Sequence, residues 1–253
     1  MPQIKCPACQ VVSHKEVNFC PSCGSDLREI IKKRKIKETQ EMYAKEFKSI
    51  SIFCGIYLSS VLLILFAGED VLLSRTFLYT VAWFDAVFIL FFLALSNINI
   101  KPSLVFDPDK TKSVSLALLA LIPVLLINYG YHFSIIKVFG IEELEGFSSL
   151  GLSFLGMVVY IVIMPGVFEE LAFRGILQEK FGRILNRSET YVIVSALFAI
   201  AHLNLFSAPY YFALSLFLCH MRTKTNSLLP CIIFHALHNL VVVLVEYFEL
   251  IKI

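Results

Sequence analysis

The chain has 253 residues, of which 57% are hydrophobic and 17% charged, with 23 phenylalanines and a mean hydropathy of +0.75. This apolar content exceeds that of an ordinary soluble domain and indicates an integral membrane protein. The formal net charge of +2 gives no indication of nucleic-acid binding, so the expected partners do not include nucleic acid.

Four cysteines lie near the N-terminus, in two C-x-x-C pairs separated by ten residues: Cys6, Cys9, Cys20 and Cys23. Four thiolates at this spacing suit tetrahedral zinc, and so short a segment could not fold without the ion. Two disulfides are the alternative, which a reducing cytoplasm disfavours. Residues 4–27 resemble the zinc ribbons that begin many prokaryotic membrane proteins. The resemblance predicts a zinc-ribbon domain over residues 1–27, with a structural zinc site or a docking platform for a protein partner.

Residues 28–49 mix charges of both signs and predict a solvated helix or linker. Lysines and arginines are numerous in this stretch, just before the first apolar run. By the positive-inside rule, the chain is expected to span the cell membrane with its N-terminus in the cytoplasm. Alternate loops further along the chain are also basic, in agreement with this topology.

Seven apolar runs follow, and each predicts a membrane-spanning helix within residues 50–253. The runs cover residues 50–67, 76–100, 113–136, 146–168, 191–206, 209–221 and 225–245. Pro209 separates the fifth run from the sixth, and both are short for a full span of about 20 residues. The expected fold class is an all-α polytopic membrane protein with about seven transmembrane helices, preceded by a small zinc-ribbon module.

Two adjacent carboxylates, Glu169 and Glu170, follow the fourth run. Glu170 and Arg174 are four residues apart with the acid first, which is the favourable order for an intrahelical ion pair. Glu169 points about 100° away on the same helix and lacks this partner. Such a carboxylate can accept a proton from water, as the general base of a hydrolase does. The alternative is a structural charge cluster at a helix end.

Two further motifs place polar residues four apart in apolar runs: Phe198 with His202, and His235 with Asn239. The histidines are expected about 16 and about 12 Å from the same side of the membrane. Singly, such residues often form hydrogen bonds between helices. Together with a carboxylate, they are the groups that amide hydrolysis needs: a base, a bound water and donors for the oxyanion. His238 could border such a cavity but is left out of the predicted site.

These motifs, in this order, resemble those of the CAAX-prenyl-protease-like and bacteriocin-processing intramembrane proteases, often called CPBP or Abi proteins. The resemblance covers about residues 150–245. The residues that carry it are Glu169, Glu170, Arg174, Phe198, His202, His235 and Asn239. It implies an endopeptidase in which Glu169, aided by His202, activates water. His235 and Asn239 would stabilise the oxyanion, while the second glutamate and the arginine would hold the geometry.

The resemblance also implies a substrate class, namely membrane-associated or lipidated peptides or proteins, as in CAAX processing or bacteriocin processing and self-immunity. The family is often labelled a metalloprotease, and one carboxylate with two histidines could hold a catalytic zinc. The H-E-x-x-H motif is absent, so the direct glutamate mechanism is favoured. The active site is expected to open toward the cytoplasm.

Two functions of other classes are alternatives. A non-proteolytic membrane scaffold would bind partner proteins and would be expected to lose the site residues, all of which are present. A transporter could use intramembrane glutamate and histidine to relay protons, but the sequence shows no internal repeat to support it.

Overall fold

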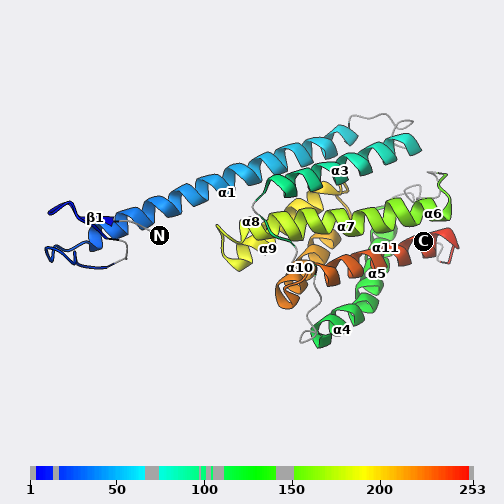
Figure 1. Cartoon of the computed structure of the whole chain (residues 1–253). Helices are drawn as coiled ribbons and strands as arrows, with labels where there is room; N and C mark the ends of the chain where they lie inside the picture. Colours follow the sequence, from blue (N-terminus) through cyan, green and yellow to red (C-terminus); the bar gives the residue numbers. More distant parts are fainter. Residues whose placement is uncertain are drawn as a thin grey trace. The chain divides into compact units, whose positions relative to one another are not determined.

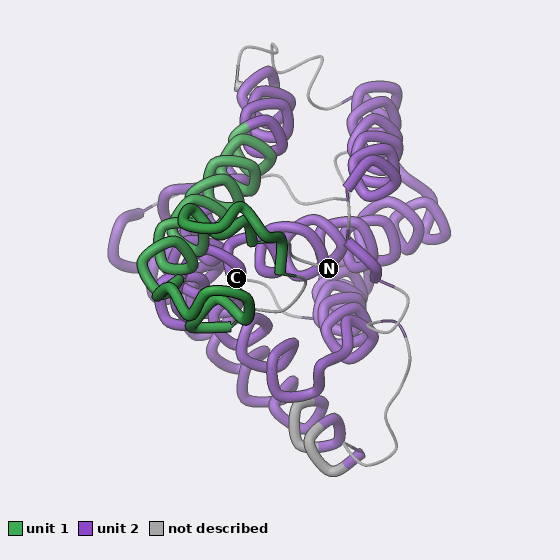
Figure 2. Tube along the Cα trace, turned by 60° about the vertical axis from the view of Figure 1, so that its left-hand side comes forward, with its two compact units in different colours: residues 1–51 green, residues 52–253 purple. Residues whose placement is uncertain are grey.

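The computed structural model describes residues 4–13, 17–65, 74–96, 98–100, 104, 111–140 and 151–250. Of the residues that the structure describes, 77% are helical, and the chain divides into two compact units, Met1–Ser51 and Ile52–Ile253, which Figure 2 colours separately. The predicted all-α membrane fold is confirmed.

Unit 1 contains a small cysteine-bearing module. Its strands β1 (Ile4–Lys5) and β2 (Val12–Ser13) pair in antiparallel register, and a second bridge joins Phe19 to Asp26. The buried centre consists of Ile4, Cys6, Cys20 and Leu27. The charged stretch predicted as a helix or linker is helical and begins α1 (Arg28–Leu65), whose residues from 52 onward belong to unit 2.

Five helical segments of the described residues are long and apolar enough to cross a membrane: Arg28–Leu63, Arg75–Leu95, Leu121–Phe139, Phe154–Phe181 and Leu229–Tyr247. The two short runs on either side of Pro209 form α9 (Arg187–Ala201) and α10 (Ala208–Thr225), which do not meet this criterion. Helices therefore lie at all seven predicted positions, and five have the length and composition of a span.

The third predicted span is broken. It forms α4 (Thr111–Leu119) and α5 (Leu121–Phe139), separated at Ala120. Pro123 explains the break, because it has no N–H to bond the carbonyl of Leu119 four residues earlier. The sequence-based prediction of one continuous helix was wrong at this point.

The fourth predicted span extends further than expected. Its helical segments are α6 (Phe154–Met157), η4 (Val158–Ile163), α7 (Met164–Glu170), η5 (Leu171–Leu177) and α8 (Gln178–Phe181). The uncharged run ends at Phe168, and the helix continues past it through Glu170 and Arg174, which form the predicted intrahelical ion pair. The segments η4 and η5 are π-helical. This form is rare in proteins overall, but where it occurs it is often at a functional site.

Helix packing in unit 2 places distant parts of the sequence side by side. α11 (Leu229–Tyr247) packs along α7 and η4, and α10 packs along α9 (Figure 1). The approach of α7 to α11 is close because Gly166 has no side chain: a Cβ there would lie 3.0 Å from the Cβ of Ala236. This crossing brings the two glutamates of α7 next to the histidines of α11.

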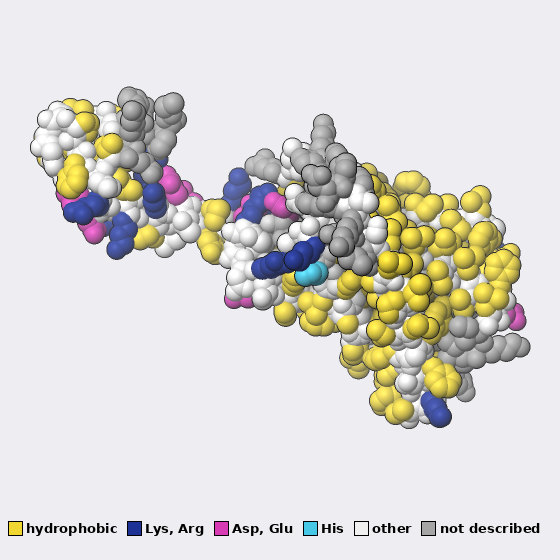
Figure 3. Space-filling model, turned by 90° about the horizontal axis from the view of Figure 1, so that it is seen from below, with side chains coloured by type: hydrophobic (Ala, Val, Ile, Leu, Met, Phe, Trp, Pro, Cys, Tyr) yellow, Lys and Arg dark blue, Asp and Glu magenta, His cyan; other side chains and the backbone are white. Residues whose placement is uncertain are grey.

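The surface of unit 2 is apolar over a wide area. Hydrophobic side chains cover much of the face shown in Figure 3. On α3 (Arg75–Leu95) alone, the exposed large side chains are Trp83, Phe84, Val87, Leu90, Phe91 and Leu95. Soluble monomers rarely expose so much contiguous apolar surface, so its natural solvent is a lipid bilayer.

Candidate active site

A cavity of about 470 Å³ lies within unit 2 and contains the predicted reactive side chains. Glu169 of α7, His202 at the end of α9, and His235 and Asn239 of α11 all line it. Much of the remaining wall is aromatic or aliphatic: Tyr160, Phe198, Tyr210, Tyr211, Leu214 and Val242. The structure thus brings four predicted site residues from three helices into one space.

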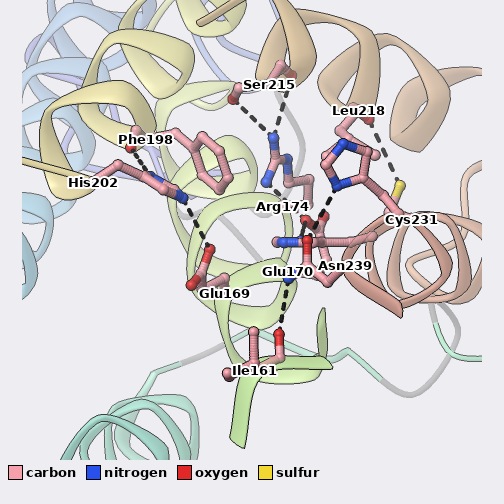
Figure 4. A network of polar contacts seen from close by, with 12 residues as sticks. Ile161, Glu169, Glu170, Arg174, Phe198, His202, Ser215, Leu218, Cys231 and Asn239 are labelled. Carbon is pink, nitrogen blue, oxygen red and sulfur yellow. Dashed lines mark hydrogen bonds and ion pairs between the residues drawn. The ribbon is translucent and has the colours of Figure 1, made fainter. Parts of the chain in front are cut away.

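Glu170 and Arg174 lie outside this lining, in a buried group that we call the Glu170 cluster: Glu170, Arg174, Ser215 and His235. Arg174 Nη1 donates to Glu170 Oε1 at 2.9 Å, so the predicted ion pair is present, and both side chains are 0% exposed. Arg174 Nη2 donates to Ser215 Oγ at 2.8 Å (Figure 4). The arginine is therefore held between η5 and α10.

His235 belongs both to the cavity and to the Glu170 cluster. Its Nδ1 lies 2.8 Å from Glu170 Oε1, and because a carboxylate only accepts, Nδ1–H is the donor. The opposite ring nitrogen, Nε2, is not engaged in this bond, and the residue lines the cavity. From the sequence, His235 is expected to act on the oxyanion; its bond to Glu170 joins residues 65 positions apart, which helical spacing does not predict.

Glu169 and His202 face each other across the cavity. Glu169 Oε2 and His202 Nε2 are 4.0 Å apart, and the two side chains are 26% and 22% exposed (Figure 4). Glu169 Oε2 is itself buried and has no hydrogen-bond partner among the described residues. A separation of this size between two polar groups is too long for a hydrogen bond but suits one bridging water.

The ring of His202 is fixed on two sides. Its Nδ1 lies 2.8 Å from the backbone oxygen of Phe198, four residues earlier, so Nδ1–H donates to that carbonyl. Tyr211 stacks on the imidazole at 3.9 Å between ring centroids. In the neutral imidazole, Nε2 is then an acceptor that points at a second acceptor, Glu169. A water molecule has two hydrogens and can donate one to each.

Asn239 is oriented by a backbone carbonyl of the facing π-helical segment η4. Asn239 Nδ2 donates to Ile161 O at 3.0 Å. An amide nitrogen carries two hydrogens, so one remains available to another acceptor in the cavity.

His238 was left out of the predicted site, yet it lines the cavity and extends this arrangement. Its Nδ1 is 3.2 Å from Asn239 Oδ1, and its Nε2 is 2.7 Å from the hydroxyl of Tyr210. The bonds are consistent as a chain in which Tyr210 donates to His238 and His238 donates to Asn239. Only the H-N dipeptide signals this in the sequence, because Tyr210 comes from another helix.

In unit 1, the four predicted metal ligands converge. The sulfurs of Cys6, Cys9, Cys20 and Cys23 all lie within 4.8 Å of one another, with Cys6–Cys23 at 3.7 Å and Cys9–Cys20 at 3.6 Å. These separations are far above a disulfide bond length, and they match the edge of about 3.8 Å that four sulfurs at 2.3 Å from a zinc ion would form.

The backbone of this module repeats itself around the cysteines. Gln10 N–H bonds to Cys6 O, and Gly24 N–H bonds to Cys20 O, at 2.9 Å in both turns. Gln10 and Gly24 both adopt positive φ, at 61° and 72°. A hydrogen bond from Ser25 lowers the pKa of the Cys23 thiol to about 6, which favours the thiolate that a metal requires. The residues present therefore fit a tetrahedral metal ion.

Comparison with known protein families agrees with the geometry of unit 2. Residues 151–241 match the family described as Type II CAAX prenyl endopeptidase Rce1-like. The chain therefore contains an Rce1-like segment. This segment includes the four cavity residues and the whole Glu170 cluster, and it confirms the family resemblance seen in the motifs. It supports a CAAX protease-like intramembrane endopeptidase, that is, a hydrolase of the membrane.

No curated protein and no solved structure matches the chain. The cysteine module of unit 1 lies outside the Rce1-like segment.

Proposed function

We propose that this protein is an intramembrane endopeptidase that hydrolyses peptide bonds of membrane-associated or lipidated peptides or proteins. The observation that carries the proposal is the pair formed by Glu169 Oε2 and His202 Nε2, 4.0 Å apart in a cavity that His235 and Asn239 also line. These groups supply a base, a water site and donors, which are the requirements of amide hydrolysis.

The first step uses the water held between Glu169 and His202. Glu169 takes one proton as the water oxygen attacks the carbonyl carbon of the scissile bond, which forms a C–O bond and a tetrahedral oxyanion. The carbon–nitrogen bond then breaks, and the proton on Glu169 passes to the leaving amine. The carboxylate is regenerated, and no co-reactant other than water is consumed.

The oxyanion would be stabilised by donors from α11. Asn239 has one amide hydrogen left after its bond to Ile161. His235 would donate from Nε2 in its doubly protonated form, in which Nδ1–H still donates to Glu170. Removing one such donor from a hydrolase typically lowers kcat by about 10²–10³-fold.

The remaining polar residues act as positioning residues. Glu170 and Arg174 fix His235, and Ser215 fixes Arg174. His238, oriented by Tyr210, holds the carbonyl oxygen of the Asn239 amide and thereby turns its nitrogen toward Ile161 and the cavity. In this mechanism the residues Glu169, His202, His235 and Asn239 touch the reacting atoms, and no catalytic zinc is required.

For unit 1 we propose a zinc ribbon over residues 1–27 that serves as a structural element or a docking site for a protein partner. The convergence of the four sulfurs supports this assignment. Metal analysis of purified protein should give one zinc ion per chain, and a Cys9→Ser, Cys20→Ser variant should lose it. If the wild type and the variant bound the same amount of zinc per chain, the assignment of the four cysteines as its ligands would be wrong.

The positive-inside pattern supports a protein of the cell membrane whose N-terminus lies in the cytoplasm and whose cavity opens toward the cytoplasm. A protease-sensitive tag on the N-terminus should then be protected in right-side-out vesicles and cleaved in inverted ones. The opposite pattern would reverse the proposed orientation.

The protease function is tested with purified protein in liposomes and a library of peptides, with and without a C-terminal prenyl group. Wild type should cleave members of the library, and His202→Ala should not. His220→Ala is the matched control, because His220 is an exposed residue of α10 that does not line the cavity. Folded wild-type protein that cleaves no peptide of either kind would contradict the proposal and favour a scaffold.

A strong chelator separates the direct glutamate mechanism from a zinc-dependent one. Because the chelator would also strip the cysteine module, the test is run on the Cys9→Ser, Cys20→Ser variant. Cleavage that persists supports the direct mechanism. Cleavage that stops, and returns when zinc is added, would assign zinc to the cavity.

A further inference from the structure

We propose that two neighbouring residues of α5, Asn128 and Tyr129, bind the peptide backbone of the substrate beside the catalytic groups. Both residues line the cavity that also contains Glu169 and His202. The inference rests on the proposed protease function for the nature of the ligand, which is a segment of peptide. We call Asn128 and Tyr129 the α5 pair.

The side chain of Asn128 is buried without a partner. The residue is 8% exposed, and its side-chain amide makes no hydrogen bond within the part of the chain that the structure describes. Its backbone carbonyl accepts from His132 Nδ1–H at 2.9 Å, so only the side chain is unused. An asparagine inside a membrane protein usually bonds to a neighbouring helix. Here the amide borders the cavity instead, where a ligand can supply a donor and an acceptor.

The hydroxyl group of Tyr129 is also unused. Its oxygen is buried and has no hydrogen-bond partner among the described residues. The hydroxyl of a buried tyrosine usually finds such a partner, because a polar group buried without one is costly in free energy. Two adjacent residues of one helix therefore offer unpaired polar groups to the same cavity.

Two nearby residues of α5 show how polar side chains hold this helix in place. The hydroxyl of Tyr131 donates to the backbone oxygen of Phe206 at 2.6 Å. His132 Nε2 lies 3.0 Å from the hydroxyl oxygen of Ser207. These bonds attach α5 to the segment that precedes α10. The helix is therefore anchored by other polar groups, and the α5 pair remains available to a ligand.

The α5 pair adjoins the part of the cavity that holds the proposed oxyanion donors. The ring of His132, one helical turn after Asn128, has its centroid 5.8 Å from that of Tyr210. The hydroxyl of Tyr210 bonds to His238, which in turn bonds to Asn239. A peptide whose scissile carbonyl lies at Asn239 would present its neighbouring peptide groups to α5.

The chemistry of this wall suits neutral peptide groups. Among the described residues that line the cavity there is no lysine or arginine, so none of them supplies a permanent positive charge for a carboxylate or a phosphate. The amide of Asn128 can accept from a peptide N–H and donate to a peptide C=O, and Tyr129 can donate to another C=O. Contacts of this kind bind an extended main chain and leave the side chains to other parts of the site.

The first test measures binding of a peptide that is not cleaved. The probe is a fluorescent peptide with a prenylated cysteine and three apolar residues, ending in an amide, and the parent protein is full-length Glu169→Gln in neutral detergent. Adding Asn128→Leu should weaken binding about tenfold or more, because two peptide groups lose their partner. Adding Tyr129→Phe should weaken it about 2–12-fold, as the loss of one hydrogen bond implies.

Tyr131→Phe is the matched control. Tyr131 belongs to the same helix, uses its hydroxyl inside the protein and is not among the residues that line the cavity. Its variant should bind the probe within twofold of the parent. An equal loss in this control would overturn the proposal, because the effect would then come from the position of α5. So would the absence of binding by the parent, or unchanged binding in both variants of the α5 pair. The unfolding temperature shows whether each variant is folded.

Backbone esters test the contact to Asn128 directly. An ester in place of one peptide bond of the probe, away from the scissile bond, removes the N–H that the asparagine would accept. At one position this change should weaken binding to the parent about tenfold, and it should weaken binding to the Asn128→Leu variant by less than twofold. Equal losses in the two proteins at every position would overturn the assignment.

Cleavage separates this inference from the protease proposal. With Glu169 intact, Asn128→Leu should raise KM about tenfold with little change in kcat, and a fall in kcat at unchanged KM would overturn its role in binding. Protein that binds the probe through the α5 pair but cleaves no peptide would contradict the protease proposal alone. Wild type that cleaves peptides, with unchanged binding and KM in Asn128→Leu, would overturn the α5 pair alone.

Discussion

Glu169 and Glu170 are neighbours in the chain, yet they lie in opposite surroundings. Glu170 is 0% exposed and its Oε1 accepts hydrogen bonds from both Arg174 and His235. Glu169 is 26% exposed, lines the cavity, and has His202 at 4.0 Å without a hydrogen bond to it. One carboxylate is committed to the protein, and the other is available to a ligand.

This difference shows how one helical turn can serve two purposes. A buried carboxylate with strong partners has little freedom to exchange protons, and it fixes the groups around it. A carboxylate that faces a cavity can bind water and accept a proton from it. In the proposed mechanism the Glu170 cluster holds the site in place, and the side chains of the cavity carry out the chemistry.

The largest change in stability is expected from Glu170→Gln. The substitution leaves the buried guanidinium of Arg174 without its counter-ion, which should lower the free energy of unfolding by about 3–5 kcal/mol. Denaturant-induced unfolding in detergent, followed by circular dichroism, measures this. Glu169→Gln serves as the matched variant and should change the free energy by less than about 1 kcal/mol. If both variants lost the same free energy of unfolding, the distinction between the Glu170 cluster and the cavity would not hold.

Asn239→Leu is expected to reduce turnover strongly. The substitution removes the proposed oxyanion donor while keeping a similar volume, so kcat should fall about 10²–10³-fold with little change in KM. Steady-state cleavage of a library peptide measures both constants. A rise in KM at unchanged kcat would instead assign Asn239 to substrate binding.

Tyr210→Phe should have a smaller effect, because it acts through His238 and Asn239. Loss of one hydrogen bond of about 0.5–1.5 kcal/mol corresponds to a fall in kcat of about 2–12-fold. KM should not change if the hydroxyl only positions the amide. Tyr247→Phe, at the end of α11, is the control and should retain the wild-type rate. A larger loss in Tyr247→Phe than in Tyr210→Phe would refute the positioning role.

The smallest effect on cleavage is expected outside both regions. The Cys9→Ser, Cys20→Ser variant should lose zinc and destabilise the cysteine module, since buried Cys20 is part of its core. The cleavage rate of a short peptide should stay within about twofold of wild type, as for a change remote from the chemistry. A greater loss would show that the module takes part in the reaction.

The spacing of residues along the sequence was sufficient to predict contacts between residues that are close in the chain. The cysteine cluster followed from two C-x-x-C pairs, and the ion pair of Glu170 with Arg174 followed from the helical repeat. The convergence of Glu169, His202 and His235 could be expected from comparable depth along their helices. These inferences depend on helix geometry alone.

Contacts between helices could not be predicted in the same way. The bonds from His235 to Glu170, from Asn239 to Ile161 and from Tyr210 to His238 join residues 65, 78 and 28 positions apart. They depend on the rotation and register of each helix against its neighbour, which close packing at Gly166 helps to fix. The π-helical segments η4 and η5 also have no local signature in the sequence.

The most direct test of the central claim is the initial cleavage rate of Glu169→Gln relative to wild type, in preparations that unfold at the same temperature. We expect a loss of about 10²–10⁴-fold, the range that general-base catalysis contributes. The amide cannot accept the proton of water, although it keeps the shape of the side chain. A variant that retains more than about a tenth of the wild-type rate would contradict the assignment of Glu169 as the base.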